Sequence, residues 1–314
     1  KQISMAFIWH FTAVELQDKV LITGTVLKNE TSIDKPVSSI FSNAWYVLSS
    51  YRKKAYKRKL IQLETEGRKF KFNTSKRGYF LEVLPVSQLL DFKIYDEDDH
   101  ELNIDQIHPY YFKNSNAEFE VISDIDDTVI HSHTASALKR ITTILFKRPK
   151  RRNKVLFSNI LLDFFNENRF RIAYLSKSES NLFGLITSIF RFNEIPKGPL
   201  FLTSYLKFKY LFKPKKAKHK LEFLHQLLRN LPNKKFFLIG DDTQGDMDIY
   251  REIIEHYKSQ IIKVYIRQTG FTIDEGQQYK WDALQNTGVD CVYFQDDDDS
   301  DLEIKNLELL INTN

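Results

Sequence analysis

Five apolar runs in the last two thirds of the chain limit its fold more than any other feature. They are "FEVIS" (119–123), "FRIAYLS" (170–176), "KFFLIGD" (235–241), "IIKVYIR" (261–267) and "DCVYF" (290–294), and a helix-like segment follows each of them. Continuous apolar runs of this length are typical of strands that are buried on both faces by helices. The sequence therefore predicts a parallel α/β sheet from about residue 118 onwards.

The first third of the chain has the shorter period of antiparallel strands. In "RKFKFNT", Phe70 and Phe72 fall on one face of a strand and Lys69 and Lys71 on the other. "AFIWHFTAV" and "VLITGTVL" are short and rich in branched and aromatic residues, which favours strands as well. Such spacings are typical of a sandwich of two antiparallel sheets.

Two domains are expected from these patterns. Residues 1–112 are predicted to form a small β-sandwich-like domain, which is interrupted by a helix where apolar residues recur at helical spacing between 38 and 56. Residues 113–314 are predicted to form a Rossmann-like α/β domain. The polar segment 109–118 contains the boundary.

Three aspartates occur within four positions directly after the first apolar run, in "SDIDDT". Like charges at this spacing repel, so the chain needs a counter-charge near them. In open α/β sheets the carboxyl ends of the strands meet at one edge, and other polar residues follow the other runs. The side chains expected to converge there are Asp124, Asp126, Ser176, Lys220, Asp241 and Asp246.

This set of side chains suits phosphoryl transfer. A hard divalent cation with oxygen ligands, Mg²⁺ above all, is the natural partner of clustered carboxylates, because it also binds a substrate phosphate. Lys220 would add a fixed positive charge, and the Ser176 hydroxyl could donate to a phosphoryl oxygen. One carboxylate would then be free to attack phosphorus, while another acts first as an acid and then as a base.

"DIDDT" resembles the D-x-D-x-T signature of the haloacid dehalogenase superfamily, and "YLS", "HK" and "GDDTQGD" follow in the order of its further motifs. With "PKGPLFL", "KKFFLIGDDTQGDMDIY" and "VYIR", the chain resembles the actin-patch-associated phosphatidate phosphatase family more closely still. The leading segments "LITGTVL" and "NTSKRGYF" are similar to the β segment that precedes the catalytic domain in that family. The resemblance implies a haloacid dehalogenase-like phosphatase domain that follows a β domain.

The resemblance also implies a role for each residue. Asp124 would be the nucleophile, and Asp126 would protonate the leaving oxygen and then activate water. Thr128 would brace the loop, and Ser176 and Lys220 would hold the phosphoryl group. Asp124, the carbonyl of Asp126 and Asp241 would bind Mg²⁺, and Asp246 would either bind it as well or support one of these ligands. Asp127 is expected to act at the turn rather than in catalysis.

The chain departs from the family pattern at two places. Residues 177–180 read Lys-Ser-Glu-Ser where the family has Asn-Ser-Pro-Trp, and Asp242 replaces a serine in the fourth motif. The catalytic set itself is intact. The contacts to the leaving group could therefore differ, whereas the phosphatase chemistry is expected to be the same.

Two stretches of the chain are strongly basic. Residues 128–162 and 195–221 contain no acid, although the whole chain has a net charge of only +5. Such stretches attract anionic lipid, and both lie where this superfamily inserts its caps. The residues expected to contact an anionic membrane or substrate are Lys147, Arg148, Lys150, Arg151 and Arg152.

The function predicted first is hydrolysis of phosphatidate, or a similar lipid phosphate, to diacylglycerol and phosphate through an aspartyl-phosphate. A phosphatase for a soluble or nucleic-acid phosphate monoester is the second reading, and an adaptor with a vestigial site is the third. The single cysteine excludes an internal disulfide and favours a reducing compartment. We therefore expect a cytoplasmic protein without an integral membrane segment that can bind the membrane surface as a peripheral protein.

Two other groups of residues, a histidine pair and an acidic tract, are weaker candidates for metal sites. His131 and His133 stand two residues apart beside the aspartates, and one is expected to pack while the other is solvated. The acidic tract "DDDDSDLE" has neither the glycine nor the spacing of an EF-hand, so a solvated loop is expected there.

Overall fold

The computed structural model describes residues 6–28, 53–104, 106–131, 154–204, 218–296 and 298–313. Residues 38–52 of the helix expected between 38 and 56 lie outside the described residues, and so do Lys147, Arg148, Lys150, Arg151 and Arg152. The expected end of that helix is wrong, because Lys54–Ala55 form a short strand. Among the residues described, no helix is both long enough and apolar enough to span a membrane.

Six parallel strands form the central sheet in the order β11-β10-β9-β12-β13-β14. All five predicted strands are confirmed, and β11 is an addition: it has only four residues and follows a Pro-Lys-Gly-Pro segment, so no periodic pattern marks it. The strands are β9 (Phe119–Ser123), β10 (Arg171–Glu179), β11 (Leu200–Thr203), β12 (Lys235–Asp241), β13 (Ile261–Arg267) and β14 (Asp290–Phe294).

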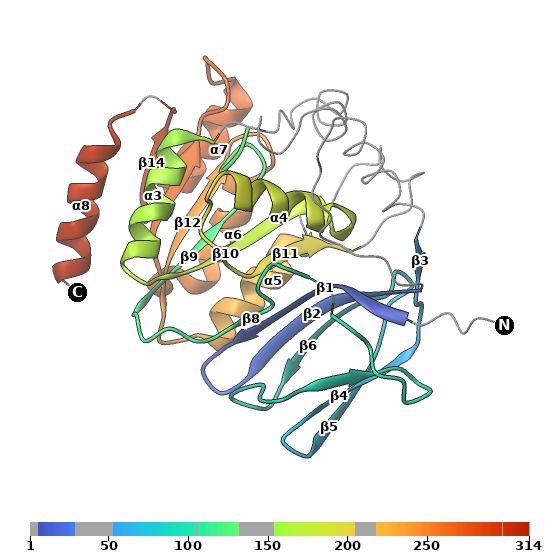
Figure 1. Ribbon diagram of the computed structural model, residues 1–314. Coiled ribbons are helices and arrows are strands. Elements are labelled where there is room, and N and C mark those ends of the chain that lie inside the picture. The colour runs from blue at the N-terminus through green and yellow to red at the C-terminus, as the bar shows by residue number, and fades with distance from the viewer. Residues whose placement is uncertain are drawn as a thin grey trace.

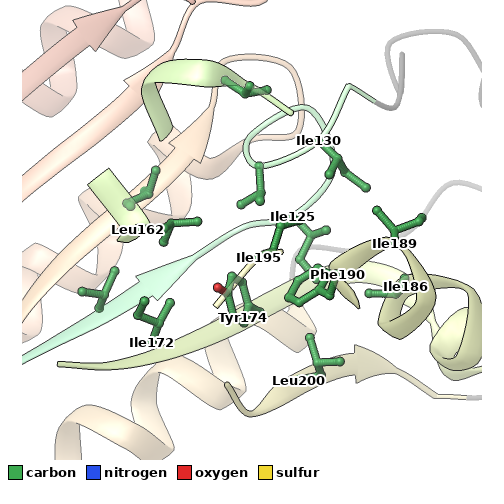
Figure 2. Packing of buried hydrophobic residues seen from close by; sticks show 14 of the residues in the cluster. Ile125, Ile130, Leu162, Ile172, Tyr174, Ile186, Ile189, Phe190, Ile195 and Leu200 are labelled. Carbon is green, nitrogen blue, oxygen red and sulfur yellow. The ribbon is translucent and has the colours of Figure 1, made fainter. Parts of the chain in front are cut away.

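Helices cover both faces of this sheet (Figure 1). On one face a core cluster joins the strands to α3 (Leu156–Glu167), α4 (Phe183–Phe192) and α8 (Ser300–Thr313). Figure 2 shows part of this cluster, where Tyr174 of β10 lies beside Phe190 of α4 and Leu162 of α3 approaches the sheet. A second cluster holds α5 (Lys218–Asn230), α6 (Asp246–Tyr257) and α7 (Glu275–Gln285) on the other face. The fold is therefore a helix–sheet–helix α/β arrangement, as predicted.

Two smaller sheets precede the central one. A five-stranded sheet has the order β3-β2-β1-β8, with β6 paired to β2, and a three-stranded sheet has the order β5-β4-β7. The two sheets share one apolar core, to which Phe72 contributes. Along its strand, Phe72 alternates with the exposed Lys69 and Lys71, as the sequence predicted. The strands are β1 (Ala6–Glu15), β2 (Val20–Lys28), β3 (Lys54–Ala55), β4 (Leu60–Thr65), β5 (Arg68–Asn73), β6 (Tyr79–Leu84), β7 (Lys93–Tyr95) and β8 (Tyr111–Phe112).

The strand β8 departs from the sequence prediction in two ways. It lies inside the segment 109–118, which was expected to be a loop, and it pairs with β1 in parallel. The larger sheet is therefore mixed rather than purely antiparallel. No sequence pattern predicts β8, because it has only two residues and forms by pairing with β1.

Strand β1 is buried along its whole length because it packs on both sides. Ile8 and Phe11 face the core between the two small sheets, whereas Phe7 and Trp9 belong to the core of the α/β part. Figure 1 accordingly shows β1 and β2 lying against the α/β part, with β4 and β5 further away. One set of β1 side chains thus packs in the core of the small sheets, and the other packs in a core of the α/β part.

The order of the central strands fixes one special point. The chain runs from β9 outwards to β10 and β11, and then returns through α5 to β12 on the other side of β9. The carboxyl ends of β9 and β12 therefore flank the place where the strand order reverses. In open α/β sheets this is the place where ligands bind.

Candidate functional site

The predicted aspartates converge at the point of strand reversal. Asp124 follows β9 and Asp241 ends β12, and the amide of Asp124 donates to Ile239 O at 2.9 Å. Asp246 begins α6, and it can approach because Gly240 has no side chain: a Cβ there would lie 2.8 Å from Asp246 Oδ2. Carboxylate oxygens of Asp124, Asp241 and Asp246 lie within 4.8 Å of one another, so this triad could hold a metal ion.

Lys220 supplies positive charge to the buried triad. It lies in the first turn of α5, and its Nζ is 2.6 Å from Asp124 Oδ1 and 2.6 Å from Asp246 Oδ1. Burial disfavours the charged amine, but the two carboxylates outweigh burial and raise the pKa of Lys220 above its ordinary value. Lys220 therefore lies beside the carboxylates whose charge it was predicted to balance.

One lysine does not balance the carboxylates around it. Burial is the largest cause that raises the pKa of Asp124, and the charges of Asp246 and Asp241 raise it further although Lys220 opposes them. Burial and Asp246 likewise raise the pKa of Asp241 to about 7. The triad therefore demands additional positive charge, which protons or a metal ion can supply.

Two serines hold the side chain of Asp126. Ser178 Oγ donates to Asp126 Oδ2 at 2.7 Å and Ser176 Oγ donates to the same oxygen at 3.2 Å, while the Ser178 amide donates to Ser176 Oγ at 2.9 Å. Sequence reasoning found Ser176 but missed Ser178. The signal was available, because residues two apart in an extended strand share a face and β10 continues to Glu179.

Gln244 is the other residue that sequence reasoning missed. Its Nε2 donates to Asp126 O at 2.7 Å, to Asp241 Oδ2 at 3.1 Å and to Asp124 Oδ2 at 3.4 Å. Thr128 Oγ1 donates to the same Asp124 oxygen at 3.4 Å, which fits its predicted role as a brace. No pattern in "GDDTQGD" sets Gln244 apart from an ordinary turn residue.

Asp127 and Asp242 are directed to structural contacts instead. Asp127 takes a left-handed backbone conformation with φ 60°, and its carbonyl accepts from Arg267 Nη1 at 2.7 Å. Asp242 accepts from Thr269 Oγ1 at 2.6 Å and from Tyr293 OH at 2.8 Å. The replacement of the family's serine by Asp242 is therefore explained by a tie to β14 and to the segment after β13.

The structure describes His131 and most of the acidic tract, which were the weaker candidates for metal sites. His131 Nε2 pairs with Asp296 Oδ2 at 2.9 Å, and Arg267 Nη2 lies 3.6 Å from the same oxygen. Asp296 is thus tied to the loop after β9. Residues 300–303 begin α8, and the buried Glu303 pairs with Lys263 at 2.9 Å, so the expectation of a solvated loop over the whole acidic tract is wrong. His133 lies outside the residues that the structure describes.

Comparison with known proteins finds a family that is similar to the α/β segment. Residues 119–268 match the family described as phosphatidate phosphatase APP1, catalytic domain. Phosphatidate phosphatase APP1 of Saccharomyces cerevisiae is 28% identical over 157 residues, which make up 47% of this chain and 25% of the yeast protein. The match thus spans about a quarter of that curated relative.

Solved structures resemble the chain only distantly. A chain of the Pnkp1/Rnl/Hen1 complex is 13% identical with a TM-score of 0.36, covering 62% of this chain and 55% of its own length. The class C acid phosphatase of Bacillus anthracis is 13% identical with a TM-score of 0.28, covering 55% of this chain and 80% of its own length. Scores this low support no conclusion. The match to the family of phosphatidate phosphatase APP1 catalytic domains covers residues 119–268, and this segment carries all the converging side chains.

Proposed function

We propose that this protein is a Mg²⁺-dependent phosphatase that hydrolyses phosphatidate, or a similar lipid phosphate, to diacylglycerol and phosphate. One observation carries the proposal: Asp124, Asp126, Ser176, Lys220 and Asp241 converge within a segment that matches a phosphatase catalytic family. The α/β segment would then be a Rossmann-like domain of the haloacid dehalogenase type.

The first chemical step transfers the phosphoryl group to the protein. A carboxylate oxygen of Asp124 attacks phosphorus and forms a P–O bond, while the bond from phosphorus to the leaving oxygen breaks. Asp126 gives its proton to that oxygen, so the alcohol leaves neutral. Lys220, which lies 2.6 Å from Asp124 Oδ1, is placed to hold a phosphoryl oxygen together with the Ser176 hydroxyl.

The second step hydrolyses the aspartyl-phosphate. Asp126, now a carboxylate, takes a proton from water as the water oxygen bonds to phosphorus, and the bond from phosphorus to Asp124 breaks. This step releases phosphate and restores both residues. Ser176 and Ser178 would keep the Asp126 carboxylate in place for both proton transfers, because both hydroxyls donate to its Oδ2.

The residues fit a hard divalent cation. Asp124, the Asp126 carbonyl and Asp241 present oxygens to one point, and Asp246 stands beside them bound to Lys220. When bound, Mg²⁺ would neutralise the carboxylates and the phosphate oxygens, so that the two like charges can approach.

The substrate class rests on the relative's name and on charge. The yeast relative is called a phosphatidate phosphatase. The basic stretches would flank the site and attract an anionic surface, with contact through Lys147, Arg148, Lys150, Arg151 and Arg152. Peripheral binding to a membrane is proposed on the same basis. A cytoplasmic location is proposed from the single cysteine, and the two-domain division at residue 112, with a β-sandwich-like first domain, from the change in strand pattern along the sequence.

A substrate panel with Asp124→Asn tests the proposed reaction. Phosphate release should be greatest from phosphatidate in mixed vesicles, should stop on chelation and return with Mg²⁺, and should be abolished in Asp124→Asn. The amide is nearly isosteric with the carboxylate but cannot attack phosphorus, so circular dichroism should be unchanged. Faster release from a nucleotide or oligonucleotide phosphate would favour the soluble-substrate alternative. No release from any substrate would favour the adaptor.

Vesicle binding tests the proposed membrane contact. Replacing Arg148, Lys150, Arg151 and Arg152 with Ser should weaken binding to anionic vesicles, because each base near the surface contributes about 1 kcal/mol at low salt. Hydrolysis of a small soluble phosphate ester should hardly change. Equal slowing of both substrates, or no vesicle binding by the unmodified protein, would contradict the contact.

A further inference from the structure

The amide nitrogen of Gln244 lies at the point where the proposed cation would bind. Gln244 Nε2 contacts Asp126 O at 2.7 Å, Asp241 Oδ2 at 3.1 Å and Asp124 Oδ2 at 3.4 Å. These are the same three oxygens that the proposed function assigns to Mg²⁺. A cation that needs oxygens at about 2.0–2.1 Å has no room beside a nitrogen at that point.

The chemistry of the three partners fixes the orientation of the amide. A backbone carbonyl can only accept hydrogen bonds, and the carboxylates accept when they are ionised. The carboxamide must therefore present its NH₂ group, which carries the partial positive charge of the side chain. In this position it does electrostatically what a cation would do, although with far less charge.

Hydrogen bonds hold the backbone of Gln244, so withdrawal of the amide would involve the side chain alone. The Gln244 amide donates to Asp241 Oδ1 at 3.0 Å, and the Lys177 ammonium donates to the Gln244 carbonyl. Gly245 then continues the turn with φ 79°. Gln244 is partly exposed, whereas Asp124 and Asp241 are buried. Rotation about the side-chain bonds alone can therefore carry the amide out toward solvent.

We propose that Gln244 is a displaceable internal competitor for the divalent cation. Its NH₂ group holds the three ligand oxygens together until the cation arrives, and it must withdraw before the cation can bind. This inference rests on the metal site of the proposed function. It adds that the affinity for the cation is limited by a side chain of the protein and that Gln244 positions the ligands without being one of them.

Cation binding measured by calorimetry tests the competition without any substrate. Protein treated with chelator and then freed of it would be titrated with Mg²⁺. Gln244→Ala removes the competing amide and should bind Mg²⁺ about tenfold more tightly, a change of about 1.4 kcal/mol. Its melting temperature without metal should fall below that of the unmodified protein, and the rise on adding Mg²⁺ should be larger.

Thr243→Val provides the matched control. Thr243 also donates through its hydroxyl and its amide to Asp241, but to Oδ1 rather than to Oδ2, the oxygen that the Gln244 side chain contacts. Removing the hydroxyl should not tighten Mg²⁺ binding. If Gln244→Ala does not fold, Gln244→Asn serves instead, because its shorter side chain keeps a polar turn but withdraws the amide.

The outcomes separate the inference from the proposed function. Mg²⁺ binding by the unmodified protein with equal or weaker affinity in the Gln244 variant overturns the competition and leaves the metal site standing. Equal tightening by Thr243→Val also overturns it, because the effect would then not come from the cation position. Failure of every protein to bind Mg²⁺ overturns both the inference and the proposed metal site.

Discussion

Lys220 is the residue on which the charge balance of the site depends. Its ammonium lies 2.6 Å from both Asp124 and Asp246, and all three side chains are buried. Removing one partner from a buried ion pair is far more damaging than the net worth of the pair, because the remaining charge is left uncompensated. Lys220 therefore contributes both to the stability of the fold and to the proposed chemistry of the site.

Replacing Lys220 with Met should lower the free energy of unfolding by about 3–5 kcal/mol at neutral pH in the presence of chelator. The deficit should shrink as the pH falls, because Asp124 and Asp241, whose pKa values are raised, then take up protons. Urea unfolding at several pH values measures this. A deficit that is the same at pH 5 and pH 8 would show that Lys220 acts by packing rather than by charge.

The pairing of strands β10 and β11 depends on a single glycine, Gly198. The segment before β11 crosses the backbone of β10 so closely that a Cβ on Gly198 would lie 1.8 Å from Ile172 O. Tyr174 OH donates to Pro196 O at 2.8 Å, and His108 Nε2 lies 2.8 Å from Gly198 O. The "PKGP" segment thus fixes the edge of the sheet by close backbone contact.

Gly198→Ala should accordingly destabilise the protein by about 3 kcal/mol or more, since no flexible side chain can yield to the new methyl group. Gly67→Ala is the control: Gly67 has a positive φ, 73°, which Gly198 does not have, and nothing lies within 4 Å of its Cβ position. Thermal unfolding of both variants compares the loss of stability from steric overlap, in Gly198→Ala, with the loss from backbone strain alone, in Gly67→Ala. Similar losses in the two would mean that β10 moves aside.

Local pattern was sufficient for the strands of the central sheet but not for its shortest element. β9, β10, β12, β13 and β14 each carry an apolar run that is visible in the sequence, whereas β11 has four residues and is held by its neighbour. The same holds in the site. Asp124 directly follows β9, Asp241 ends β12 and Ser176 lies near the end of β10. Gln244, by contrast, reaches the cation position only through the turn after β12, which no periodicity encodes.

At the scale of the whole molecule, the small sheets and the α/β part are joined by buried polar contacts as well as apolar ones. Trp9 Nε1 donates to Ser180 O at 2.5 Å, just after the serines that hold Asp126. His10 stacks on Phe183 with a centroid distance of 4.5 Å, and its Nε2 lies 3.1 Å from Leu200 O. These contacts join residues more than 170 positions apart, so the sequence could not reveal them.

The buried histidines should make this junction sensitive to acid. Burial lowers the pKa of His10 to about 3 and that of His219 to about 4, from 6.5. The unfolded chain therefore binds protons below pH 6.5 that the folded protein refuses. The stability contributed by the neutral rings is complete above pH 6.5 and is lost as the pH falls toward 3–4, by about 1.4 kcal/mol per unit for each ring.

Replacing His10 with Gln tests the origin of this loss, because the amide can still donate to Leu200 O but does not titrate. The slope of unfolding free energy against pH, measured by urea unfolding between pH 6.5 and 4.5, should decrease by about one proton. The raised carboxylate pKa values of the site act in the opposite direction, and both proteins share them. An unchanged slope would locate the acid sensitivity elsewhere.

The hairpin between β4 and β5 offers a practical point of attachment. Glu66 and Gly67 form its tip with φ values of 49° and 73°, and open space surrounds the Cβ position of Gly67. Figure 1 places this hairpin at the outer side of the small sheets, away from the central sheet. A dye, an affinity peptide or a surface tether inserted there would leave Asp124 and Gln244 untouched. Vesicle binding and cation uptake could then be followed on the same immobilised molecule.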